Sequence, residues 1–142
     1  RHLAGSPIAS IDGRCVGRDP GAPVRDDKAT ITLTFEDGSL GTVHYFANGH
    51  KAYPKERIEV FCGGRVLVMD NYRRLQGYGW KGLPRLPAFR QDKGQAAWAA
   101  EFVRRITEGL GPPIEMEELL EVSHATIEVG IALRGFPPAC DR

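Results

Sequence analysis

The chain has 142 residues, enough for about one ordinary domain with its own core. Hydrophobic residues make up 42% of it and charged residues 26%, which excludes a disordered tail. No apolar run approaches the roughly 18 residues of a membrane-spanning helix. Nineteen basic and 18 acidic side chains leave a net charge of +1, so we expect neither a nucleic-acid partner nor a membrane partner.

The cysteines and the first residues indicate the cellular context. Cys15, Cys62 and Cys140 are odd in number and form no C-x-x-C pair, so we expect no disulfide framework and no zinc knuckle. Reduced thiols and the lack of an opening signal peptide are typical of a cytoplasmic protein.

There is no initial Met, and residues 1–7 resemble the end of a helix, with Gly5 as its C′ residue. We therefore expect a fragment of a longer protein.

Alternating apolar and polar residues predict strands in the first half of the chain. A weakly alternating strand is expected over residues 8–17, followed by a polar loop over 18–27. The clearest strand covers residues 28–36, where Ile31, Leu33 and Phe35 alternate with threonines at positions 30, 32 and 34. Asp37-Gly38 then predicts a hairpin with a type I′ turn.

Four more strands and two helices complete the prediction. The strands cover 39–47, 56–62, 65–70 and 72–78, and a Gly/Pro-rich basic linker covers 79–91. Asp92 and Gln95 resemble a capping box that opens a helix ending at Gly109. A second helix is expected over 116–133. The predicted apolar stripes are Trp98, Ala99, Phe102, Val103 and Ile106 in the first helix, and Leu119, Val122, Thr126, Val129 and Leu133 in the second.

Strands that precede helices favour an α+β fold. We expect an open, mainly antiparallel sheet with the two C-terminal helices packed on one face. The opposite face carries the threonines, and in the return strand Val43 and Tyr45 lie on one face and His44 and Phe46 on the other. This second face meets solvent, another domain or a second copy; apolar residues of both parities favour a second copy, whereas the threonines would also suit water.

No motif in the chain is typical of a catalytic or cofactor site. Walker A, G-x-S-x-G and H-E-x-x-H patterns are absent, and residues 77–82 lack the spacing of a dinucleotide-binding turn. We therefore predict no catalytic residue, no bound cofactor and no metal within the chain. His44 and His124 are interpreted as packed or partner-facing side chains.

One loop offers candidate substrate-binding residues. His50, Tyr53, Lys55 and Arg57 place several hydrogen-bond donors around an aromatic ring, as a site for a sugar or polyol requires. A solvated hairpin loop is the simpler interpretation of the same residues. The basic stretch over residues 73–93 is interleaved with aromatic residues, but acidic helix starts balance it.

Several segments together resemble a known family. They are residues 31–49, residues 54–61, Met69-Asp70-Asn71 and Gln91-Asp92-Lys93-Gly94, followed by the two helices. In this order they resemble the C-terminal domain of Gfo/Idh/MocA oxidoreductases. The likeness is greatest to the bi-domain branch, in which a zinc-type alcohol dehydrogenase-like region precedes the module.

The resemblance implies a division of labour with an upstream region. In the family, a Rossmann domain holds NAD or NADP and a Glu-Lys-Pro lysine acts beside the substrate. In the family, a His/Asp pair of the H-x-x-D type lies just before a segment of the form Leu-x-Arg-x-Leu-Ala-Gly. Residues 1–5 resemble the tail of that segment, so the resemblance implies that the pair lies upstream of residue 1. His2 does not match the position of the histidine of that pair.

Residues 1–142 would then be a single substrate-side and dimerisation domain of an NAD(P)-dependent oxidoreductase acting on a sugar or polyol. Its expected partners are the upstream Rossmann domain and a second copy bound through the sheet, and the fragment alone is expected to be inactive. The alternative is a non-catalytic module for sheet-mediated oligomerisation or ligand binding.

Overall fold

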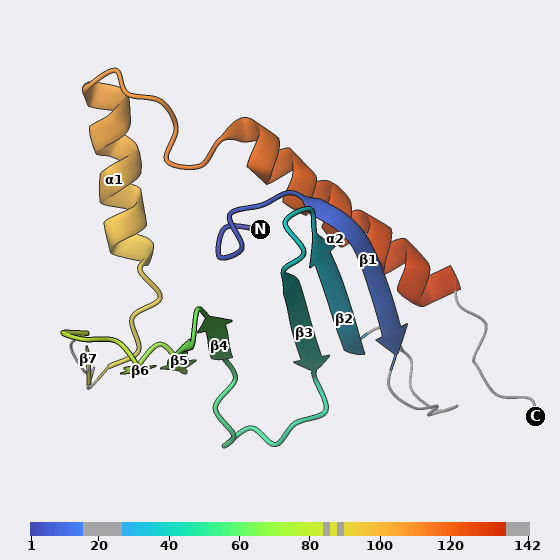
Figure 1. Cartoon of the computed structure of the whole chain (residues 1–142). Coiled ribbons are helices and arrows are strands. Elements are labelled where there is room, and N and C mark those ends of the chain that lie inside the picture. The colour runs from blue at the N-terminus through green and yellow to red at the C-terminus, as the bar shows by residue number, and fades with distance from the viewer. Residues whose placement is uncertain (16–26, 84–85, 88–89, 136–142) are drawn as a thin grey trace, which may run out of the picture. The chain divides into compact units, whose positions relative to one another are not determined.

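The computed structural model describes residues 1–15, 27–83, 86–87 and 90–135 (Figure 1). Within them, strands come first and helices last, which confirms the predicted α+β class. The chain divides into two compact units, residues 1–49 with 111–142 and residues 50–110, and each is described by itself. In chain order the elements are β1 (Ile8–Cys15), β2 (Lys28–Phe35), β3 (Leu40–Phe46), β4 (Arg57–Cys62), β5 (Arg65–Asp70), β6 (Arg74–Tyr78), β7 (Leu86–Pro87), α1 (Gln95–Thr107) and α2 (Met116–Gly135).

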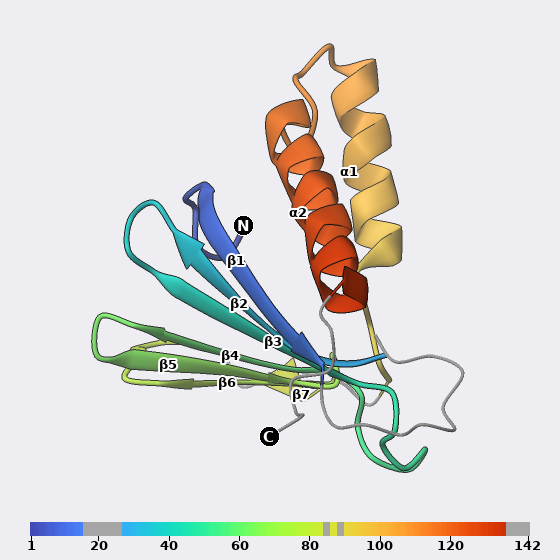
Figure 2. The same cartoon turned by 90° about the vertical axis from the view of Figure 1, so that its right-hand side faces the viewer.

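The first unit contains an antiparallel sheet in the order β1-β2-β3 (Figure 2). Ile31 lies opposite Gly13 and Val43, whereas Thr30 lies opposite Arg14 and His44. Directly opposite residues share a face, so the apolar and threonine sets of β2 occupy different faces as the alternation predicts. The ends of β2 are buried, with Ala29 2% and Phe35 5% exposed.

The β2–β3 hairpin has a different turn from the one predicted. Gly38 has φ +84°, but Asp37 is not among the positive-φ residues, so the turn is not type I′. The Gly38 N–H donates to the Phe35 carbonyl at 2.9 Å, and Phe35 pairs with Ser39. This is a three-residue loop closed by a glycine bulge. The Asp37 carboxylate instead accepts bonds from the Ser39 hydroxyl and N–H, which lower its pKa.

Helix α2 packs on β1 of the same unit. A Cβ atom on the buried Gly13 would lie 3.1 Å from Leu133 Cδ2 and 3.8 Å from Val129 Cγ1. Val129 is 8% exposed, so the predicted stripe is correct at these two positions. It is wrong near the helix start, where Leu119 and Val122 are exposed.

Glu121 takes part in the contact between α2 and β1. Its carboxylate accepts the Ile8 N–H at 2.5 Å and Arg1 Nε at 2.9 Å. These bonds lower the pKa of Glu121, the Ile8 bond most. A charged side chain occupies this face of the helix because the first residue of the strand offers it a free N–H.

The second unit contains an antiparallel sheet in the order β4-β5-β6-β7. Gly63 and Gly64, with φ +55° and +73°, form the turn between β4 and β5. At Gly77 in β6, the side chains of Trp80 and Leu83 occupy the space that a Cβ atom would otherwise fill. The two-residue β7 was not predicted. It lies inside a Pro-rich segment, and two residues are too few to show an alternating pattern of apolar and polar side chains.

Helix α1 begins and ends at glycines. Its N-cap is Gly94, with φ +75° and no side-chain cap bond, so the predicted capping box is wrong. The Asp92 carboxylate accepts the Gly94 N–H at 2.8 Å instead. At the other end, the Leu110 N–H donates to the Arg105 carbonyl and the Gly109 N–H to the Ile106 carbonyl. This Schellman arrangement confirms Gly109 as the stop.

The apolar stripe of α1 lies at the surface, since no residue of this helix is buried. Trp98 is 55% and Ile106 64% exposed, and Trp98 stacks on Phe102 with ring centroids 5.5 Å apart. Neither helix in the described part of the chain is both long and apolar enough to cross a membrane.

Candidate functional site

The predicted substrate-binding residues lie on the loop that leads into β4. The Tyr53 N–H donates to the His50 carbonyl at 2.9 Å, and His50 Nδ1 accepts the Ala52 N–H at 3.2 Å. This tight turn puts the proton of a neutral His50 ring on Nε2. Tyr53 is 73% exposed, so its ring and hydroxyl are open to a ligand.

Arg57 is held in place by its own strand. Its Nε and Nη2 both donate to Glu59 Oε1, at 2.9 and 2.6 Å. The pKa of Arg57 is raised chiefly by Glu59, and further by the nearby Asp70 and Tyr53. Lys55 is exposed, and within the described part of the chain it forms no hydrogen bond or ion pair with the other three side chains.

A second polar group lies next to this loop and was not predicted. We call it the 56–93 latch, and it comes from three separate segments of the second unit. Lys93 Nζ donates to Glu56 Oε1 at 2.6 Å and lies 5.6 Å from the centroid of the Tyr72 ring. The glutamate raises the pKa of Lys93. The latch comprises Glu56, Asn71, Tyr72, Gln91 and Lys93.

The middle of the latch is a strained turn between β5 and β6. Asn71 and Tyr72 have φ +50° and +52°, and the Arg73 N–H donates to the Asp70 carbonyl at 3.0 Å. A type I′ turn without glycine is costly, above all for a bulky residue such as Tyr72. Gln91 Nε2 donates to both the Asn71 carbonyl at 3.2 Å and its Oδ1 at 2.9 Å. Such strain occurs at sites where surrounding contacts enforce it.

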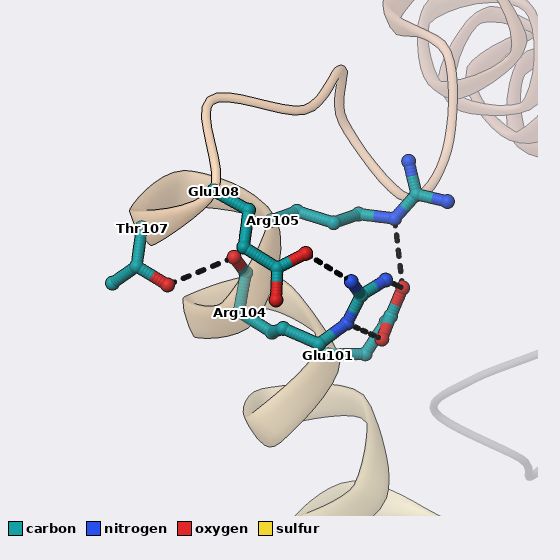
Figure 3. Close-up of polar contacts among 5 residues, drawn as sticks. All are labelled: Glu101, Arg104, Arg105, Thr107 and Glu108. Atoms are coloured by element: carbon teal, nitrogen blue, oxygen red, sulfur yellow. Dashed lines mark hydrogen bonds and ion pairs between the residues drawn. The ribbon is translucent and has the colours of Figure 1, made fainter.

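Helix α1 carries a network of charged side chains (Figure 3). Glu101 accepts from Arg104 Nη2 and from Arg105 Nε, each at 2.8 Å, and Arg104 also pairs with Glu108. The two arginines lower the pKa of Glu101 to about 2. The partners are three or four residues apart, as on the surface of any stable helix, and we assign the network no chemistry.

The chain's glycine-rich segment does not fit a dinucleotide. It begins within β6, and the next helix, α1, begins only at Gln95. A Cβ on Gly77 would meet Leu83 Cδ2 at 2.5 Å and Trp80 Cδ1 at 3.0 Å, so side chains fill the space beside this glycine. The residues that the structure describes also contain no group of three His, Cys, Asp or Glu able to hold a metal ion.

The fold resembles part of a solved dehydrogenase structure. Two crystal forms of UDP-N-acetylglucosamine 3-dehydrogenase GnnA from Acidithiobacillus ferrooxidans match the chain with TM-scores of 0.72 and 0.69. In both, sequence identity is 18%, and the match covers 93% of this chain but 42% of the dehydrogenase chain. The chain therefore has the fold of one part of that enzyme and spans less than half of its length.

Comparisons at the level of sequence add no relative. No protein-family model matches the chain, and no curated protein matches it. At 18% identity the structural likeness establishes the fold alone, so the active-site residues of the dehydrogenase are not transferred to this chain.

Proposed function

We propose that residues 1–142 form the substrate-side domain of a nicotinamide-dependent oxidoreductase that acts on a sugar, a polyol or a nucleotide-linked sugar. The observation that carries the proposal is the fold match to a sugar-nucleotide dehydrogenase, which covers 93% of this chain and 42% of the dehydrogenase chain. The segments that resemble Gfo/Idh/MocA C-terminal domains support it independently. Membership of that family, and of its bi-domain branch, belongs to the proposal and rests on those segments.

The proposal assigns the cofactor to residues outside this chain. NAD or NADP would supply the hydride acceptor, and the space beside Gly77 in the glycine-rich segment is filled by Leu83 and Trp80. The contribution of this chain is then a wall of the substrate site. It would bind and orient a polyhydroxylated molecule, and the acid–base residues would come from elsewhere in the protein.

We assign substrate contacts to His50, Tyr53, Lys55 and Arg57. The exposed Tyr53 ring can pack against the apolar face of a pyranose, while the Arg57 guanidinium can donate to hydroxyl or phosphate oxygens. Arg57 is already oriented by Glu59, so binding would immobilise little additional side-chain freedom.

The open face of β1-β2-β3 is the proposed dimer surface. Thr30 Oγ1 lies 3.0 Å from His44 Nδ1, and the His44 ring stacks on Phe46 at a centroid distance of 5.7 Å. Phe46 is 49% and Leu40 71% exposed on the same face. Apolar side chains among threonines are typical of a surface that pairs with a second copy.

The test is an assay of the protein encoded by the complete reading frame that contains residues 1–142. We expect it to reduce NAD or NADP in the presence of a sugar or nucleotide sugar, as measured by nicotinamide absorbance. Arg57→Ala should raise KM for that substrate, and Lys51→Ala, an exposed lysine of the same loop, serves as the matched control. A complete protein that binds no nicotinamide would favour the alternative, a non-catalytic binding or oligomerisation module.

A further inference from the structure

The attachment of α1 within its own unit requires an explanation, because apolar packing does not provide it. No residue of the helix is buried, and its first turn has no side-chain cap. The segment that leads into it, residues 91–94, is instead held by polar contacts to the β5–β6 turn and to the start of β4.

These contacts converge on the strained turn. The Asn71 carbonyl accepts from the Gln91 side chain, and the Tyr72 carbonyl accepts the Asp92 N–H at 3.2 Å. Both acceptors belong to the residues with positive φ. The left-handed conformation of the turn is therefore linked to its contact with residues 91–92, and losing that contact would remove the bonds that offset the strain.

A single ion pair closes the arrangement. Glu56 bonds both to the segment before α1 and to the β5–β6 turn. Its carboxylate accepts a hydrogen bond from Lys93, and its backbone carbonyl accepts one from the Asn71 N–H at 2.6 Å. The side chains of Lys93 and Glu56 are 42% and 29% exposed, so dissolved salt screens their attraction. The other hydrogen bonds of the latch join neutral groups, and the Lys93 ammonium also lies 5.6 Å from the centroid of the Tyr72 ring.

We propose that the ion pair between Glu56 and Lys93 closes the 56–93 latch and so fastens the start of α1 to the β5–β6 turn. The latch opens as ionic strength rises. Closed, the latch holds residues 91–94 and the left-handed turn together. Open, it frees the first turn of α1 and lets Asn71 and Tyr72 relax. The inference concerns only residues 50–110 and does not depend on the proposed function.

Amide hydrogen exchange of the full chain, read residue by residue by NMR, tests the proposal. The reporters are the N–H groups of Asp92 and Trp98, which bond to the Tyr72 and Gly94 carbonyls. We expect Lys93→Met to speed their exchange about twofold to fivefold at low salt, while Lys81→Met, another exposed lysine of the unit, leaves it unchanged. Lys93→Arg retains the charge and should retain most of the protection.

A salt titration supplies a test that needs no variant. Raising the salt to about 1 M, where the Debye length is about 3 Å, should bring the wild-type rates toward those of Lys93→Met and leave the variant unchanged. Protected N–H groups of β4 and β5 should not respond, which distinguishes latch opening from unfolding. Equal rates in the wild type and Lys93→Met, or an equal salt response in both, would overturn the proposal.

Discussion

The contact between β1 and α2 yields a prediction whose size follows from the structure. Gly13 is buried, and a Cβ there would already lie 3.1 Å from Leu133 Cδ2. Alanine therefore requires a shift of a few tenths of an ångström, whereas the further carbons of leucine have no space beneath the helix. We expect Gly13→Leu to destabilise the first unit by about 1–3 kcal/mol, the usual cost of overpacking.

Urea unfolding followed by far-ultraviolet circular dichroism measures this loss. With an m-value of about 2 kcal/mol/M, the midpoint should fall by about 0.5–1.5 M. Trp80 and Trp98 both belong to residues 50–110, so their fluorescence serves as an internal control for the other unit. Adding Leu133→Ala to Gly13→Leu should recover part of the loss, because the two side chains compete for one space. An unchanged midpoint for Gly13→Leu would refute the packing of α2 on β1.

Three further predictions concern other parts of the molecule. Glu101 has a pKa of about 2 against an ordinary 4.5, so its stabilising bonds are complete above about pH 4.5 and are lost as the pH falls toward 2. A carboxyl NMR titration should show this low midpoint, and a midpoint near the ordinary value would contradict the network on α1. Glu121→Ala removes the acceptor of the Ile8 N–H, so amide exchange at Ile8 should accelerate, and unaltered exchange would count against that bond. Gly77→Ala would place a Cβ 2.5 Å from Leu83 Cδ2 and should destabilise residues 50–110 by about 1–3 kcal/mol, visible as an earlier transition in tryptophan fluorescence; a transition at the wild-type midpoint would show that the space is open.

The strands could be predicted because their signals are local. Period-two alternation in β2 and the paired glycines at 63–64 identify a strand and a turn without reference to the rest of the chain. The Asp37-Gly38 turn was placed correctly but given the wrong type. Its conformation depends on whether the aspartate carboxylate bonds to the following Ser39, which residue identities alone do not determine.

The face of α2 that packs on the sheet could be predicted only in part. An apolar stripe can be drawn through Leu119 and Val122, yet the helix instead turns Glu121 toward the first strand. The charged residue is stable there because a backbone N–H and Arg1 meet it, and both lie more than 100 residues away in the sequence. Pattern analysis assumes that charges face water and cannot anticipate such a partner.

The candidate site shows the same limit. His50, Tyr53, Lys55 and Arg57 were found because they are close together in sequence, and their role as substrate contacts stays a prediction. The 56–93 latch was missed because its members come from three segments, and its clearest sign is the backbone conformation of Tyr72. Tyrosine carries no sequence signal for positive φ, whereas asparagine at the preceding position does.

The measurement that tests the central claim most directly is the hydride-transfer assay of the complete gene product with a panel of sugars, polyols and nucleotide sugars. If residues 1–142 are the substrate-side domain of an oxidoreductase, that protein should reduce NAD or NADP with at least one member of the panel, and Arg57→Ala should raise its KM while Lys51→Ala does not. A complete protein with neither nicotinamide binding nor hydride transfer would contradict the assignment.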